Sequence, residues 1–195
     1  MLYTFKGSEK MKILDVGSYK GRYKGSNKDV VITLDIDKNN NPDVVHDLEK
    51  VPYPFEDNEF DMVYASHVLE HLSNPLDFFK EMQRICKRNA IIKIRVPHFS
   101  SVWAYNFIHK RYFGIGNFYT PLLDGFEIKK IRLNWLMPPT TYYSPKHNIL
   151  LRTINNILNF LANLNQHFCE RFWCYFVGGF SEIEIQLLNK KKVRR

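Results

Sequence analysis

The sequence predicts an α/β fold built on a mostly parallel, twisted sheet. Over the first hundred residues, short apolar strands alternate with crossover segments, and strands joined in this way run parallel with right-handed connections. A polar residue or glycine follows each strand, as expected where a ligand binds at the carboxyl ends of parallel strands. These strand-end residues are Asp15 with Gly17, Asp35, Asp47, Ser66 and His98.

Each strand and the main helix have a local signal. Five strands are predicted at 12–16, 30–34, 43–46, 60–65 and 90–96, and two more at 126–133 and 180–188. Ser73-Asn74-Pro75 predicts the start of a helix, because Ser and Asn cap helices and proline suits the first turn. Apolar residues recur at helical spacing down to Lys87, and residues 87–89 are expected to turn the chain into the fifth strand.

The first strand leads into a glycine turn that favours a ribose-bearing ligand. Gly17 and Gly21 let the backbone approach a ligand where a Cβ would collide. Asp35 follows Asp15 by twenty residues, and a carboxylate at the end of the second strand can accept both ribose hydroxyl protons. Tyr19 replaces the middle glycine of the nicotinamide-binding pattern. Residues 19–29 are poor helix formers and predict a loop or a helix of about one to two turns.

The most specific pattern is D-L-E-K-V-P-Y-P-F-E-D-N-E-F-D-M-V from Asp47, followed by V-L-E-H ending at His71. Together with the glycine turn, it resembles class I S-adenosylmethionine-dependent methyltransferases of the UbiE-like type. The resemblance covers residues 12–97. It implies a Rossmann-like class I methyltransferase fold, with helices on both faces of the sheet and an antiparallel hairpin at one edge. It also implies S-adenosylmethionine as cofactor and S-adenosylhomocysteine as product.

The resemblance implies a role for each residue that matches a family motif. Asp15 and Gly17 are expected near the methionine end of the cofactor, and Ser18 and Gly21 of the same turn are also expected to bind the cofactor. The expected partners of its other parts are Asp35 for the ribose, Ile36 flanking the adenine, Asp47 and Leu48 at the adenine edge, and Ser66 beneath the sulfonium.

Residues 98–143 are expected to form a lid over the acceptor. This segment holds twelve aromatic residues and is interrupted by glycines and prolines, so it could exclude water from the reaction. Pro97 to Ser101, with Ala104 and residues 109–111, resembles a subset of these enzymes associated with glycan-modification gene clusters, which implies sugar or polyol acceptors. A hydroxyl acceptor needs a general base, and the candidates in order are His98, His109 and His67.

Other chemistries have weaker support. His67 and His71 are spaced i, i+4 with Glu70 between them, but the pattern is not H-E-x-x-H, and no metal site is predicted. A serine hydrolase would need G-x-S-x-G. A methyltransferase that modifies nucleic-acid bases should show N/D-P-P-Y/F after the fourth strand, where Tyr64-Ala65-Ser66-His67 stands instead.

Length and composition indicate one methyltransferase domain over residues 1–195. Its expected parts are a cofactor-binding core at 12–97, a lid and long helix at 98–170, the final strand at 171–189 and a basic tail at 190–195. The net charge of +8 favours anionic partners, although a terminal charge run is more often simply solvated. The three cysteines match no zinc spacing and indicate reduced thiols in the cytoplasm. No apolar run is long enough to span a bilayer.

Residues 149–168 are expected to form a long helix. Its apolar stripe is Leu150, Ile154, Ile157, Leu161, Leu164 and Phe168. We expect this stripe to pack on its own domain, with a dimer seam as the alternative, so the protein is a monomer or a homodimer. The predicted function is methyl transfer to an oxygen or nitrogen of a small-molecule or glycan-linked acceptor. The alternatives are an RNA-modifying methyltransferase and a non-catalytic subunit that binds S-adenosylmethionine.

Overall fold

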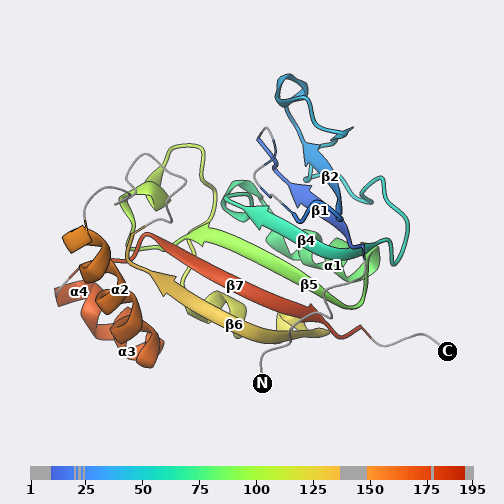
Figure 1. Ribbon diagram of the computed structural model, residues 1–195. Helices are drawn as coiled ribbons and strands as arrows, with labels where there is room; N and C mark the ends of the chain where they lie inside the picture. Colours follow the sequence, from blue (N-terminus) through green and yellow to red (C-terminus); the bar gives the residue numbers. More distant parts are fainter. Residues whose placement is uncertain are drawn as a thin grey trace.

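The structure, a computed structural model, describes residues 10–19, 21, 23, 25–136, 149–176 and 178–191 (Figure 1). One seven-stranded sheet has the order β3-β2-β1-β4-β5-β7-β6. The strands are β1 (Lys12–Val16), β2 (Val30–Asp35), β3 (Val44–Val45), β4 (Phe60–Ser66), β5 (Cys86–Pro97), β6 (Phe126–Asn134) and β7 (Glu182–Asn189). The first five strands pair in parallel, and β7 is antiparallel to both β5 and β6. The predicted α/β sheet with an antiparallel edge hairpin is confirmed.

Strand β5 differs from the prediction at its start. It begins at Cys86, directly after α1 (Pro75–Ile85), so residues 87–89 belong to the strand and do not form a separate turn. Phe60 of β4 pairs with Cys86, whereas Met62 pairs with Ile91. The residues between them bulge out of the ladder, and Asn89 takes a left-handed backbone conformation there (φ 65°). Between β1 and β2, none of the described residues is helical.

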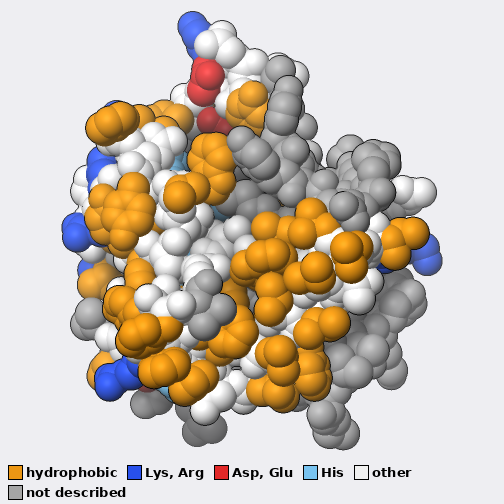
Figure 2. All heavy atoms as spheres, turned by 90° about the vertical axis from the view of Figure 1, so that its left-hand side faces the viewer, with side chains coloured by type: hydrophobic (Ala, Val, Ile, Leu, Met, Phe, Trp, Pro, Cys, Tyr) orange, Lys and Arg blue, Asp and Glu red, His pale blue; other side chains and the backbone are white. Residues whose placement is uncertain are grey.

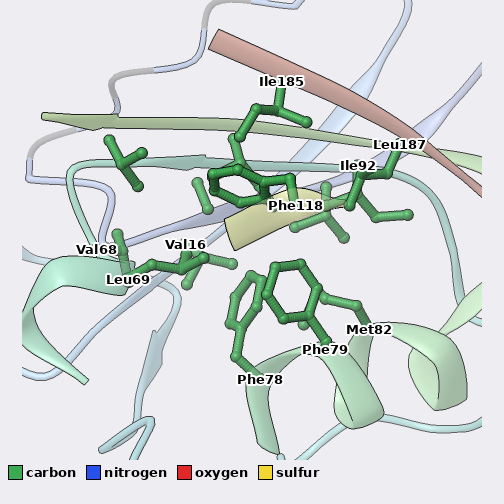
Figure 3. Close-up of a cluster of buried hydrophobic side chains, with 14 of the residues drawn as sticks. Val16, Val68, Leu69, Phe78, Phe79, Met82, Ile92, Phe118, Ile185 and Leu187 are labelled. Carbon is green, nitrogen blue, oxygen red and sulfur yellow. The ribbon is translucent and has the colours of Figure 1, made fainter. Parts of the chain in front are cut away.

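The core lies between α1 and the sheet. Asn74 caps α1 by accepting a hydrogen bond from the backbone N–H of Leu76, 3.3 Å away. Phe78, Phe79 and Met82 point from this helix toward strand side chains such as Ile92 and Leu187 (Figure 3). Burying each large apolar side chain stabilises the fold by about 1.5–3 kcal/mol. This core fixes β4 and β5, whose carboxyl ends form part of the site described below.

Residues 98–125 connect β5 to β6 through three short 3₁₀ helices, η3 (Val102–Tyr105), η4 (Ile115–Phe118) and η5 (Pro121–Leu123). The aromatic residues of this segment divide into two groups. Phe113 and Phe118 are buried and belong to the core, whereas Trp103, Tyr105 and Phe107 are exposed. Tyr142 and Tyr143 of the predicted lid, and residues 192–195 of the basic tail, lie outside the described residues.

The C-terminal helical segment comprises α2 (Ile149–Leu164), α3 (Gln166–Phe168), a π-helical turn η6 (Cys169–Trp173) and α4 (Cys174–Phe176). The expectation that its apolar stripe packs on the domain is wrong. The stripe residues are all exposed, by 69% at Leu150, 38% at Ile154, 53% at Ile157, 44% at Leu161, 67% at Leu164 and 51% at Phe168. Figure 2, which faces this end of the molecule, shows the hydrophobic side chains gathered on the surface.

The opposite, amide-bearing face of α2 packs along β6. Asn163 accepts from the N–H of Leu133 (2.9 Å) and donates to its carbonyl (2.8 Å). Asn159 accepts from the N–H of Trp135, which follows β6 (2.7 Å), and Gln166 of α3 donates to the carbonyl of Ile131 (2.7 Å). Strand β6 is last in the sheet, so its outer backbone groups need partners. Because the amide-bearing face of α2 binds these backbone groups, the apolar stripe on the opposite face of the helix points outward. Within the described part of the chain, no helix is both long and apolar enough to cross a membrane.

Candidate active site

A cavity of about 350 Å³ lies at the carboxyl ends of the parallel strands. That volume is within the range of small-molecule sites. Its walls include five residues that the sequence predicts as cofactor contacts, from the turn after β1, the end of β2 and the loop after β3: Gly17, Asp35, Ile36, Asp47 and Leu48. Residues far apart in the sequence thus meet at one sheet edge, as the strand-end pattern predicts.

Asp35 is held rigidly at the end of β2. It is only 7% exposed, and its two carboxylate oxygens accept from the N–H groups of Tyr19 (3.0 Å) and Asp37 (2.9 Å). A carboxylate oxygen has two lone pairs, so each oxygen can still accept a hydrogen bond from a ligand hydroxyl.

The glycine turn after β1 depends on Gly17. Its φ is +63°, and a Cβ added there would lie 2.5 Å from Cγ2 of Val68. Its N–H and that of Ser18 both donate to the carbonyl of Leu34, at 2.8 and 3.2 Å. Tyr19, which replaces the middle glycine, also has a positive φ of 34°, a conformation that costs a non-glycine residue about 1–3 kcal/mol. The turn therefore keeps its glycine geometry at the expense of strain.

Four other predicted cofactor contacts, Asp15, Ser18, Gly21 and Ser66, are absent from the walls of this cavity. Asp15 is fully buried and accepts from the N–H of Tyr23 at 2.9 Å, so it positions the segment between β1 and β2. Ser18 and Ser66 are also buried.

His67 lines the cavity but is poorly suited to be a base. Its Nδ1 lies 3.3 Å from Oε1 of Glu70, and its Nε2 lies 3.3 Å from Oε2 of Glu182. Burial alone would lower the pKa of His67, but these two carboxylates outweigh it and raise the pKa to about 9. Arg95 binds the other oxygen of Glu182 at 2.7 Å. With His67 protonated, the two buried carboxylates and two cations balance, and no imidazole lone pair remains to accept a proton.

His98, the first candidate base, is fully buried and does not line the cavity. Its Nδ1 accepts from the N–H of Ser100 (3.2 Å), so the proton is on Nε2, which donates to Oε1 of Glu170 (3.0 Å). The same carboxylate oxygen accepts from the N–H of Ile115 (2.6 Å). His98 therefore connects β5 and η4 to the C-terminal helices, and this geometry argues against a role as base.

Two histidines meet beside the cavity, one of them in its wall. His71 of η2 (Leu69–His71) lines it, and His109 lies against His71 with ring centroids 4.7 Å apart. Lys110, which also lines the cavity, forms an ion pair with Glu49 at 2.8 Å. Sequence reasoning did not include His71, Lys110 or Glu49 in the site. The motif V-L-E-H contains His71, but only the fold brings residues 109–110 beside it.

Comparison with known proteins finds a matching family model over part of the chain. Residues 14–94 match the family model of the methyltransferase domain, and no curated protein matches the sequence. Solved structures with a similar fold include an S-adenosylmethionine-dependent methyltransferase from Archaeoglobus fulgidus, at 19% identity and TM-score 0.59, with 92% of this chain and 86% of that one covered.

Two further structures share the fold. An S-adenosylmethionine-dependent methyltransferase from Mesorhizobium loti has 12% identity and TM-score 0.59, covering 92% of this chain and 91% of that one. Phosphoethanolamine N-methyltransferase 2 of Haemonchus contortus, in complex with S-adenosyl-L-methionine, has 17% identity and TM-score 0.61, covering 95% and 50%. At these identities the likeness establishes the fold alone. The chain therefore has a class I methyltransferase fold, and its residues 14–94 match a methyltransferase domain.

Proposed function

We propose that the cavity binds S-adenosylmethionine, with its ribose on Asp35 and its methionine end toward Gly17. Ile36 and Leu48 flank the adenine, and Asp47 accepts from the adenine amino group. The observation that carries this proposal is that all five residues line the same cavity. An exposed Ile36, 66% accessible without a ligand, fits a residue that an adenine ring covers.

The bound cofactor supplies a methyl group that its sulfonium already activates. The protein then brings the acceptor into line and excludes water, which can be worth roughly 7–11 kcal/mol when the alignment is good. If the acceptor is a hydroxyl, its proton must leave. We assign that proton to Nε2 of His109, because Nδ1 of this ring is engaged with the carbonyl of Ala104 at 3.1 Å. General-base catalysis of this kind contributes about 10²–10⁴-fold.

We further propose a small-molecule or glycan-linked acceptor, as in the glycan-associated subset of UbiE-like enzymes. Tyr105 and Tyr112 are exposed, with ring centroids 5.1 Å apart, and Trp103 is also exposed. Such rings suit the apolar face of a sugar. They also suit unpaired RNA bases, and with the net charge of +8 this keeps an RNA acceptor as the second candidate. Salt-dependent retention of RNA with methyl incorporation would favour RNA, whereas incorporation into glycans alone would favour the first proposal.

Calorimetry with S-adenosylhomocysteine tests the cofactor site. The wild-type protein should bind it, and Asp35→Ala should lose most of that affinity, because the ribose acceptors are removed. Asp37→Ala is the matched control, since it removes a carboxylate from the same turn that is not part of the cavity wall. Unchanged affinity in Asp35→Ala would show that the ribose lies elsewhere. Binding without turnover on any acceptor would favour a non-catalytic role.

A further inference from the structure

Three potential metal ligands converge beside the cavity. One ligand atom each from Glu70, His71 and His109 lie within 4.8 Å of one another. Glu70 and His71 belong to η2, whereas His109 comes from the segment after β5. The backbone N–H groups of Lys110 and Arg111 both donate to the carbonyl of Glu70, at 2.7 and 3.2 Å. These two hydrogen bonds fix His109 next to η2.

The hydrogen bonds of the two histidines leave one nitrogen of each ring available to a metal ion. Nδ1 of His71 faces the carbonyl of Ile108 at 3.4 Å, and Nδ1 of His109 faces the carbonyl of Ala104 at 3.1 Å. A carbonyl oxygen can only accept, so Nδ1 carries the proton in both rings and each Nε2 keeps its lone pair. Metal-binding histidines are oriented in this way, with the second ring N–H donated to a carbonyl or carboxylate.

The third member, Glu70, is a buried carboxylate whose lone pairs are not occupied by aligned donors. The residue is 1% exposed, and neither of its oxygens has a well-aligned hydrogen-bond donor among the described residues. Its nearest cation is His67, 3.3 Å from Oε1, at ion-pair distance but without hydrogen-bond alignment. A carboxylate oxygen without an aligned donor keeps its lone pairs available to a metal ion.

We propose that Glu70, His71 and His109 bind one divalent transition-metal ion. Two imidazoles and one carboxylate form a catalytic zinc ligand set, which leaves a position open for water or substrate. Magnesium and calcium prefer oxygen ligands and fit less well. Ligands of a tetrahedral zinc ion are roughly 3.4 Å apart, so side-chain shifts of the order of 1 Å would close the site.

The site would make the reaction metal-dependent and selective for oxygen. His71 belongs to both the ligand set and the cavity wall, so the ion would lie where the acceptor enters. A hydroxyl that reaches an open metal position has its pKa lowered and would release its proton to water, so that His109, as a metal ligand, would not act as the base. An amine bound there would instead lose the lone pair it needs to react. This consequence, unlike the metal binding itself, rests on the proposed methyl-transfer function.

Metal binding is measured on tag-free, metal-stripped protein by competition with a chromogenic chelator for Zn²⁺, and with Co²⁺ as a spectroscopic probe. We expect one ion per chain and a Co²⁺ spectrum without thiolate bands. His71→Ala, His109→Ala and Glu70→Gln should each weaken binding by more than the roughly 10–100-fold expected for a lost outer-shell partner. His167→Ala is the control, because His167 is exposed and outside the cluster. Mg²⁺ should not compete.

The same variants are titrated with S-adenosylhomocysteine, which separates this inference from the proposed function and shows that each variant is folded. Normal binding of S-adenosylhomocysteine without stoichiometric Zn²⁺ binding would overturn the metal site and leave the cofactor site intact. Zn²⁺ binding that is equally weakened in His167→Ala would also overturn it. Zn²⁺ binding that depends on all three ligands, in a protein that does not bind S-adenosylhomocysteine, would support the metal site and reject the proposed function.

Discussion

Backbone groups without a strand partner occur at two boundaries of the sheet, and different side chains bind them. One boundary is the carboxyl ends of the parallel strands, called the cofactor edge below, and the other is the outer edge of β6. At the cofactor edge, the carboxylate of Asp35 accepts hydrogen bonds from backbone N–H groups in the turns that follow β1 and β2. Along the outer edge of β6, the amides of Asn163 and Gln166 bind strand carbonyls, and Asn163 also binds an N–H. A carboxylate can only accept, which leaves it suited to a ligand's hydroxyls. An amide both donates and accepts, and so it can stand in for a neighbouring strand.

Glu182 joins the two regions, and its loss should have the largest effect. It accepts from Asn134 of β6 at 3.1 Å and binds both Arg95 and His67. Glu182→Ala would leave these cations buried without their partner, and we expect a loss of about 3–5 kcal/mol in the free energy of unfolding. Urea denaturation measures it. Glu184→Ala, on the same strand but only half-buried, is the control, and an equal loss there would contradict the reasoning.

The same carboxylate gives the stability a predictable pH dependence. Burial alone would raise the pKa of Glu182, but His67 and Arg95 outweigh it and hold the pKa below its ordinary value. Since the pKa is lower in the folded state, the stabilisation is present above the ordinary glutamate pKa of about 4.3 and is lost as the pH falls below it. In Glu182→Ala, this part of the acid-induced loss should be missing from denaturation curves measured between pH 7 and pH 3.

The cofactor edge was the more predictable region, because its signals are local. A glycine with a positive φ, an acid at a strand end and a proline in the first turn of α1 each follow from a few neighbouring residues. The direction in which the apolar stripe of α2 faces does not follow from neighbouring residues. Its apolar spacing predicts burial, but the outer groups of β6 decide the outcome, and no short sequence pattern reports that Asn163 faces Leu133. For the same reason, the sequence named His109 as a candidate base but did not predict its contact with His71, which only the fold brings about.

Gly17→Ala tests how strictly the cofactor edge depends on glycine. Its Cβ would overlap Val68, and its φ would be left-handed. We expect a loss of about 2–4 kcal/mol in unfolding free energy, from backbone strain and overpacking together, with weaker binding of S-adenosylhomocysteine. Adding Val68→Ala should restore only the part due to overlap. A double variant no better than Gly17→Ala would mean that the backbone conformation alone requires glycine.

Asn163→Leu tests the amide face of α2 at the other boundary. The N–H and carbonyl of Leu133 would lose their partners, which should cost about 1–3 kcal/mol in unfolding free energy. Asn156→Leu makes the same change on the exposed face of the same helix and should have little effect. Amide hydrogen exchange at Leu133 should quicken in Asn163→Leu alone. Equal effects of the two substitutions would show that α2 does not protect the edge of β6.

The smallest expected effect concerns the apolar stripe itself. Ile157 is 53% exposed, so Ile157→Asn should change the free energy of unfolding by no more than about 0.5 kcal/mol. If the stripe were packed on the core, the same substitution would lower the free energy of unfolding by about 2–5 kcal/mol. Denaturation at low and high protein concentration completes the test, because a second copy covering the stripe would make wild-type stability depend on concentration. A large loss at every concentration would mean that the helix buries its apolar face after all, and the distinction between the two boundaries would fail.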